Sequence, residues 1–142
     1  MIIYTDGAYS SKTNRGGWAY VIVQSDHTIC NNGGEFKTTN NRMELTALLQ
    51  ALKICSAVNE HHTIYTDSAY IANCFDQKWY IKWRINGWRN AAKEPVKNQD
   101  LWEQILALYD PATISICKVK GHENDQYNIL ADKLAVEGRT KL

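Results

Sequence analysis

The order of the hydrophobic patterns along the chain limits its fold more than any other feature of the sequence. Three strand-like segments come first, and the connections between them are short and polar, which favours antiparallel pairing. Helix-like and strand-like segments then alternate, as they do in parallel βαβ units. The expected strands are 1–9, 18–24, 28–37, 61–66 and 113–120, and the expected helices are 38–58, 67–75, 98–110 and 124–138. We therefore predict an α/β fold with a mixed five-stranded sheet, in which three antiparallel strands precede parallel ones and helices cover both faces.

The length of the chain predicts a single domain. Its 142 residues contain no linker-like stretch, so we expect one domain over residues 1–142. No apolar run approaches the roughly 18 residues that span a bilayer, and the N-terminus lacks the basic region of a signal peptide. We expect a cytoplasmic monomer that needs no membrane and no obligate protein partner. The four cysteines are not spaced as zinc ligands, which favours free thiols.

Positive charge is concentrated in one stretch of the sequence. Residues 78–97, called the basic segment below, contain six Lys and Arg residues and one Glu, a net charge of +5. Since the whole chain carries +1, the remainder carries −4. This distribution indicates a polyanion as the partner of the basic segment and a carboxylate site elsewhere.

Two nearly identical segments, IYTDGAY at 3–9 and IYTDSAY at 64–70, differ at one position. A turn follows the first segment and a helical pattern follows the second, so the flanking sequences argue against internal duplication. We interpret both segments as strands, each of which delivers an aspartate, Asp6 or Asp67, to the same region of the fold.

Four carboxylates stand out, and each has an ordinary structural explanation. Asp6 precedes a glycine, as in many hairpin turns. Glu44 follows Asn41 at the spacing of a capping box. Asp67 is placed to cap a helix, and Asp132 is placed on a helix that has an exposed side.

The positions of the same four residues nevertheless favour a shared site. Glu44 lies on the apolar face of its expected helix, four residues before Leu48, and Asp132 falls among apolar positions of the last helix. Asp6 and Asp67 belong to strands expected to be central. Buried carboxylates need partners, and few Lys or Arg residues are close in sequence to provide them. Because hard cations prefer oxygen ligands, the four carboxylates indicate a Mg²⁺ or Mn²⁺ site.

Five motifs, in order, make the sequence similar to a known family. They are TDG, TTNNRMELTALLQAL, YTDSAY, GW…PVKNQDLWEQI and VKGH…N…AD.LA. Together they resemble ribonuclease H of type 1, the bacterial ribonuclease HI kind, from Ile3 to Ala135. The resemblance implies a ribonuclease H-like mixed sheet, and we expect no separate hybrid-binding domain in residues 1–142. It also implies an endonuclease that hydrolyses the RNA strand of RNA/DNA hybrids and leaves 5′-phosphate and 3′-hydroxyl ends.

The resemblance implies a catalytic set of five residues: Asp6, Glu44, Asp67, His122 and Asp132. The four acids would bind two Mg²⁺ ions, with Mn²⁺ as a possible substitute. One ion would activate the attacking water, and the other would stabilise the leaving 3′ oxygen. His122 would shuttle protons or assist product release, although a lone histidine between a strand and a helix is more often a surface residue.

Contacts with the substrate are also implied by the resemblance alone. Thr39 and Asn98, joined by Lys37, would bind a phosphate of the DNA strand at a helix start. Asn40 would read the minor groove, unless its role is N-capping. Asn128 would orient the attacking water or a carboxylate. Gly7 is interpreted as a place where the chain approaches the substrate backbone.

The basic segment corresponds to the handle of this family. We expect Trp79 to belong to the core, and we expect a second group of residues to contact the DNA backbone: Trp83, Arg84, Trp88 and Arg89. The segment is less basic than the usual handle, which predicts weaker binding with a flatter salt dependence. Ala69 stands where many relatives carry Gln, so one minor-groove contact is expected to be missing. The first loop lacks their Gly/Pro-rich run, and Lys12 and Arg15 are candidates to replace its contacts with the RNA.

Two other functions remain open at this point. A junction resolvase or integrase core has the same broad fold, but the TNNRMEL and VKGH motifs argue against it. A catalytically inactive nucleic-acid-binding module is the second alternative, and the presence of all four acids argues against that.

Overall fold

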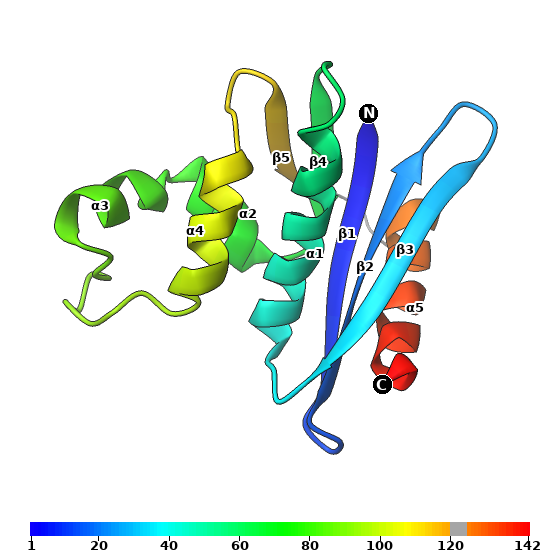
Figure 1. Cartoon of the computed structure of the whole chain (residues 1–142), viewed down its shortest axis with the longest axis horizontal. Coiled ribbons are helices and arrows are strands. Elements are labelled where there is room, and N and C mark those ends of the chain that lie inside the picture. The colour runs from blue at the N-terminus through cyan, green and yellow to red at the C-terminus, as the bar shows by residue number, and fades with distance from the viewer. Residues whose placement is uncertain (120–124) are drawn as a thin grey trace.

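A computed structural model describes residues 1–119 and 125–142 of the chain (Figure 1). The elements are β1 (Ile2–Ser10), β2 (Arg15–Val23), β3 (Thr28–Phe36), α1 (Asn40–Cys55), β4 (His62–Thr66), α2 (Ala69–Asp76), α3 (Trp79–Asn86), α4 (Gln99–Leu108), β5 (Ile114–Lys118), α5 (Gln126–Gly138) and the short 3₁₀ helix η2 (Arg139–Lys141). Each strand and helix expected from the sequence is present, with bounds that differ by a few residues.

The sheet has five strands in the order β3-β2-β1-β4-β5. β1 pairs antiparallel with β2, and β2 pairs antiparallel with β3. β1 pairs parallel with β4, and β4 pairs parallel with β5. This topology confirms the predicted mixed sheet. Because Thr5 is in register with Thr66, the next residues of the two strands, Asp6 and Asp67, are neighbours at the end of the parallel pair.

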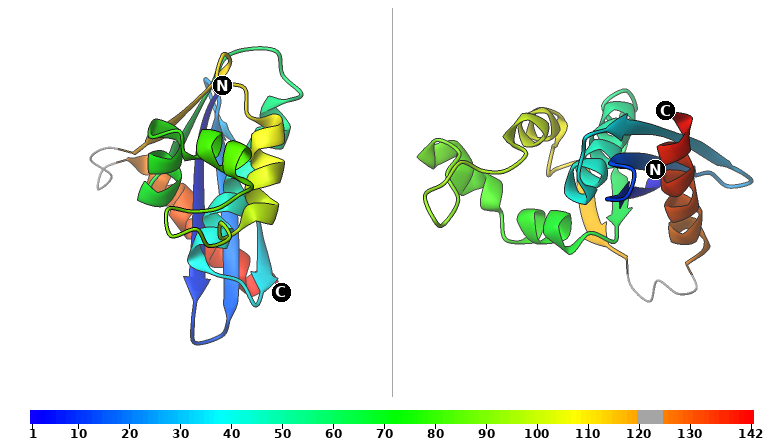
Figure 2. Two further views of the ribbon diagram at one scale, coloured as in Figure 1. Left: turned by 90° about the vertical axis from the view of Figure 1, so that its left-hand side faces the viewer. Right: turned by 90° about the horizontal axis from the view of Figure 1, so that it is seen from below.

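Helices cover both faces of the sheet, as the sequence predicted (Figure 2). Consecutive residues of β2 show the two sides, because successive side-chain positions of a strand point to opposite faces. A Cβ atom on Gly16 would meet Met43 of α1, whereas one on Gly17 would meet Ala135 of α5. α4 packs beside α1, and fully buried residues such as Leu48, Ile64 and Trp102 fill the layer between these helices and the sheet.

The basic segment lies at the end of the molecule away from β3, where α3 and the following loop stand clear of the sheet (Figure 1). Trp83 anchors this segment, since it is only 7% exposed and its ring lies 5.4 Å from the ring of Trp102. Trp79 is only partly buried. Trp79, expected in the core, packs against it but stays half-buried, whereas Trp83, expected to contact the DNA backbone, is the more deeply buried ring because Trp102 of α4 lies against it.

None of the helices within residues 1–119 and 125–142 has the length and apolar character needed to cross a membrane.

Candidate active site

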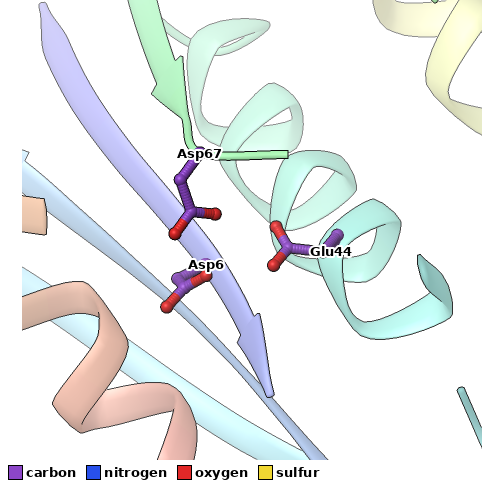
Figure 3. A group of neighbouring side chains, drawn as sticks. All are labelled: Asp6, Glu44 and Asp67. Atoms are coloured by element: carbon purple, nitrogen blue, oxygen red, sulfur yellow. The ribbon is translucent and has the colours of Figure 1, made fainter. Parts of the chain in front are cut away.

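Three carboxylates converge between the sheet and α1 (Figure 3). Asp6 comes from β1, Glu44 from α1, and Asp67 from the residue after β4. Each offers one oxygen, and these oxygens all lie within 4.8 Å of one another. Separations of that size allow the three side chains to bind one cation.

The local structure removes the ordinary explanations for these acids. Asp6 lies in the middle of β1, paired with Ala19, so it is not part of a turn. The Ser68 hydroxyl, not Asp67, caps α2 by accepting a hydrogen bond from the backbone N–H of Ile71. The helix that carries Glu44 is capped by Thr39, so a capping box that pairs Asn41 with Glu44 does not form.

Gly7 brings Glu44 close to Asp6. A Cβ atom at position 7 would overlap the backbone of Met43 and Glu44, so only glycine lets α1 approach β1 this closely. This role of Gly7 differs from the expected one, which was a site of approach for the substrate backbone. The backbone that lies against Gly7 is that of the protein's own helix.

The burial of the four acids corrects one expectation. Asp6 and Glu44 are buried, at 2% and 4% exposed, but Asp67 and Asp132 are exposed. Asp67 lies just beyond the end of β4, and Asp132 lies on a side of α5 that the sheet does not cover. Asp132 nevertheless lies near Asp6, because it adds to the raised pKa of that carboxyl after burial and the charges of Glu44 and Asp67. The site thus has a buried floor and an open side.

Burial and mutual repulsion control the ionisation of the two buried acids. Burial raises the pKa of Asp6 well above its usual range, and the nearby charges of Glu44 and Asp67 raise it further. The pKa of Glu44 is raised as well, chiefly by burial and also by the charge of Asp67. Without a counter-ion, the cluster therefore resists full ionisation.

The donor set fits a divalent cation. Asp6 Oδ2 and Glu44 Oε2 are buried and have no hydrogen-bond partner among the described residues. Leaving such oxygens unpaired is costly, and a bound cation would satisfy them. A set made only of carboxylate oxygens suits Mg²⁺ or Mn²⁺.

In metal-free solution, we expect the free energy of unfolding to fall as the pH rises above about 4, the ordinary carboxyl pKa. The folded pKa values of Asp6 and Glu44 are raised, so the folded state keeps protons that the unfolded chain has already released. This contribution to the free energy of unfolding is present in full below the carboxyl pKa of the unfolded chain. It is lost as the pH rises towards the pKa values of Asp6 and Glu44 in the folded protein. Thermal unfolding in EDTA at about pH 5 and about pH 8 measures the loss, and added Mg²⁺ should reverse it at the higher pH.

Asp6→Asn provides the control for this experiment, because it removes one of the two buried titrating groups. The variant should lose less stability than the wild type over the same pH range. Other groups, such as Asp100 with its lowered pKa, contribute equally to both proteins and cancel in the comparison. An identical decline in both proteins would contradict the assignment.

A second group of predicted residues gathers where α1 and α4 begin. Lys37, Thr39 and Asn40 are exposed around the start of α1, and Asn98 precedes α4. Arg42 links the two helix starts: its guanidinium donates to Asn98 Oδ1 at 3.4 Å and to both carboxylate oxygens of Asp100. Arg42 stands in the TTNNR motif but could not be recognised from the sequence alone, because its partners are distant in sequence.

The basic segment surrounds a pocket of about 540 Å³. Aromatic rings of Tyr70, Trp79 and Trp83 line it together with cationic side chains, among them Lys82 and Arg89. This composition suits a ligand with both apolar and anionic parts.

Two further members of the predicted handle contacts lie beside this pocket. The Trp88 ring stacks on Trp83 with centroids 5.7 Å apart. Arg84 turns towards α4, where its guanidinium donates to the Leu106 carbonyl at 3.4 Å. Because that interaction already occupies Arg84, this residue is a weaker candidate for substrate contact than Arg89.

Asn128 lies in the first turn of α5. Asn128 is 8% exposed, and its Oδ1 is buried without a hydrogen-bond partner among the described residues. A buried amide oxygen of this kind is available to a ligand or water. His122 lies outside the described residues, so its predicted role stays a prediction.

The chain as a whole is similar to proteins of one family. The RNase H family model matches residues 1–140. A curated relative named Ribonuclease H, from Syntrophomonas wolfei subsp. wolfei, is 42% identical over 135 residues, which cover 95% of this chain and 92% of that protein. The solution structure of the PFV RNase H domain matches with a TM-score of 0.77 and 28% identity over 99% of this chain and 94% of that one. A foamy viral protease-reverse transcriptase in complex with RNA/DNA hybrid matches with a TM-score of 0.79 and 26% identity over 99% of this chain and 20% of that one.

Proposed function

This chain belongs to the RNase H family of nucleases, and from that premise we propose that it hydrolyses the RNA strand of RNA/DNA hybrids by two-metal-ion catalysis. The products would carry 5′-phosphate and 3′-hydroxyl ends. The observation that carries the proposal is the convergence of Asp6, Glu44 and Asp67, with buried carboxylate oxygens that lack partners among the described residues. The family match favours this reaction over those of a resolvase or an integrase core.

Four carboxylates would hold the cations, with Mg²⁺ as the expected metal and Mn²⁺ as a substitute. Asp6 and Glu44 form the buried floor, while Asp67 and Asp132 offer ligands on the open side. When bound there, two cations would supply an activated water and charge stabilisation at the leaving 3′ oxygen. The protein's own contribution is to hold these ligands at fixed positions, on β1, at the end of β4, and on the helices α1 and α5, so that little reorganisation accompanies the reaction.

Two residues other than the carboxylates would position the attacking water and transfer protons. The Asn128 Oδ1 atom is available to orient the attacking water or a carboxylate. His122 would move a proton or assist product release.

The substrate would extend from the carboxylates to two further surfaces, one at the starts of α1 and α4 and one at the basic segment. Thr39 and Asn98, with Lys37 nearby, would bind a phosphate of the DNA strand, and Asn40 would reach the minor groove. In the basic segment, Trp88 and Arg89 would follow the DNA backbone, with the half-buried Trp79 as a third contact. The RNA strand is identified by its 2′-hydroxyls, which a wide minor groove displays. Only a hybrid presents such a strand together with a flexible DNA strand.

With Mg²⁺ present, the protein is expected to cut the RNA strand of an RNA/DNA hybrid and to leave single-stranded RNA, double-stranded RNA and double-stranded DNA intact. The four substrates should carry one sequence and an end label, and the products should be resolved on a denaturing gel. Treatment of the products with a phosphatase and a ligase reports the end groups. EDTA should stop the reaction, and Mg²⁺ or Mn²⁺ should restore it.

Cleavage of duplex DNA at rates like those of the hybrid would favour the resolvase alternative, and tight hybrid binding without cleavage would favour the inactive module. Gel filtration with light scattering tests the further proposal that the protein acts as a monomer. Its cytoplasmic location and its independence of protein partners stay predictions.

A further inference from the structure

Arg42 occupies an unusual position between the starts of two helices. Its guanidinium binds Asp100 in the first turn of α4 with two nearly parallel hydrogen bonds, Nη1 to Oδ1 at 3.0 Å and Nη2 to Oδ2 at 2.8 Å. Bidentate pairs of this kind restrict both partners in orientation as well as distance. The pair therefore fixes the start of α4 against α1.

The same guanidinium also orients Asn98. Nη1 donates to Asn98 Oδ1 at 3.4 Å, although the residue has a left-handed backbone with φ of 63°. The Asn98 side chain makes no capping hydrogen bond to α4 within the described residues, so its orientation depends on Arg42. Since Oδ1 accepts from Arg42, the amide Nδ2 is the atom that remains to donate to a ligand.

The backbone of Arg42 acts on the second proposed phosphate ligand. The Arg42 N–H donates to the Thr39 hydroxyl oxygen at 3.1 Å, which leaves the hydroxyl hydrogen of Thr39 to be donated elsewhere. A single residue thus contacts Thr39 through its backbone and Asn98 through its side chain, and both contacts leave a donor for an anion.

Arg42 is itself poorly suited to bind the phosphate. Both terminal nitrogens are occupied by Asp100, and that carboxylate neutralises the charge of the guanidinium. The side chain of Arg42 is 32% exposed, about half the exposure of Asp100 at 62%. The charge that faces solvent at this pair is thus mainly negative, which would not attract a phosphate.

We propose that Arg42 is a positioning residue, which holds the Asn98 amide and the start of α4 so that Asn98 and Thr39 together bind a phosphate of the DNA strand. This inference rests on the proposed function. Asp100 holds the Arg42 guanidinium in place, although its carboxylate is itself an anion next to the proposed phosphate site.

Arg42→Gln and Asp100→Asn separate positioning from simple electrostatics. If Arg42 attracted the phosphate by charge, Arg42→Gln would weaken binding and Asp100→Asn would strengthen it, because the second change removes a repelling carboxylate. If the ion pair positions Asn98, both changes should weaken binding, by roughly fivefold each, the worth of about one hydrogen bond. The probe is a fluorescently labelled RNA/DNA hybrid, and its affinity is measured by anisotropy with Mg²⁺ in an Asp6→Asn background that prevents cleavage.

A double-mutant cycle with Asn98→Ala tests whether Arg42 acts through Asn98. Once the Asn98 amide is absent, Arg42→Gln should change the affinity by less than about twofold. Arg89→Gln, in the basic segment on another part of the surface, is the matched control. The changes in binding free energy caused by Arg89→Gln and Arg42→Gln should be additive in the double variant. In the cleaving enzyme, Arg42→Gln should raise KM while leaving kcat within about twofold, because the interaction is not with the reacting atoms.

Salt dependence provides an independent readout. Loss of a direct Arg–phosphate contact would reduce the slope of log affinity against log salt by about one unit. Loss of a neutral Asn98 donor should leave the slope unchanged. Thermal unfolding of each variant checks that the folds are intact.

Tighter binding by Asp100→Asn, additivity of Arg42→Gln with Asn98→Ala, or a reduced salt slope would each overturn the proposal. Cleavage of the hybrid by the wild-type protein is measured separately. If that cleavage fails, the proposed function is wrong; if it succeeds and the cycle is additive, only the role of Arg42 is wrong.

Discussion

Asp6→Asn is expected to lower the cleavage rate by about a thousandfold or more, and to make the metal-free protein more stable at the same time. The rate falls because the change removes a ligand from the buried floor of the proposed cation site, where placement and charge stabilisation carry the reaction. Single-turnover cleavage of an RNA/DNA hybrid in Mg²⁺ measures this loss. Affinity for the hybrid should change far less, since the phosphate-binding residues lie elsewhere.

The gain in stability has a separate cause. Asp6 is 2% exposed, faces two other carboxylates, and has one buried oxygen without a partner among the described residues. A neutral amide of the same shape removes the repulsion, so the free energy of unfolding at about pH 8 in EDTA should rise by on the order of 1–3 kcal/mol. Added Mg²⁺ should stabilise the wild type more than the variant, so the difference between their free energies of unfolding should become smaller.

Asp26→Asn is the matched control for Asp6→Asn. Asp26 is an exposed aspartate whose one ion pair among the described residues is with the neighbouring His27, so its amide variant should retain activity and stability. An active Asp6→Asn protein would show that the carboxylate cluster is not the catalytic site. An inactive variant that is less stable than the wild type in EDTA would show that Asp6 is a structural residue with a neutralising partner.

The sheet, and the element that carries each of the three carboxylates, were predictable because they follow from local patterns. The two nearly identical segments predict strands that deliver Asp6 and Asp67, and helical periodicity places Glu44 on the buried face of α1. The convergence of the three side chains was expected from burial and from the family resemblance, because the pairing of β1 with β4 is a contact between segments that are distant in sequence.

The features that the sequence did not reveal all depend on such contacts. Trp83 is more deeply buried than Trp79 because the Trp102 ring of α4 packs against it. Arg42 binds a residue 58 positions away, and no local pattern marks the pair. The exposure of Asp67 and Asp132 depends on where the helical layers end over the sheet, which hydrophobic spacing alone does not specify.

Gly7→Ala is expected to destabilise the protein by about 3 kcal/mol or more, and to reduce cleavage even at temperatures where the variant is folded. The new methyl group would overlap the backbone of Met43 and Glu44. Backbone atoms of a helix cannot move aside as the end of a flexible side chain can, so α1 must shift as a unit or the strand must distort. Either movement separates Glu44 from Asp6. Urea unfolding measures the stability, and single-turnover cleavage of the hybrid well below the unfolding midpoint measures the catalytic effect.

Gly87→Ala separates the effect of overlap from that of removing a glycine. Gly87 ends α3 with φ of 76°, and a Cβ atom there would have no neighbour within 4 Å among the described residues. That variant should lose only about 1 kcal/mol, the cost of a left-handed backbone for alanine, and its cleavage rate should stay within about twofold of the wild type. Equal losses in the two variants would mean that the close approach of α1 to β1 does not position Glu44. A Gly7→Ala protein that is destabilised but keeps its full rate and Mg²⁺ affinity would likewise limit Gly7 to packing, and would show that the carboxylate cluster tolerates a displaced helix.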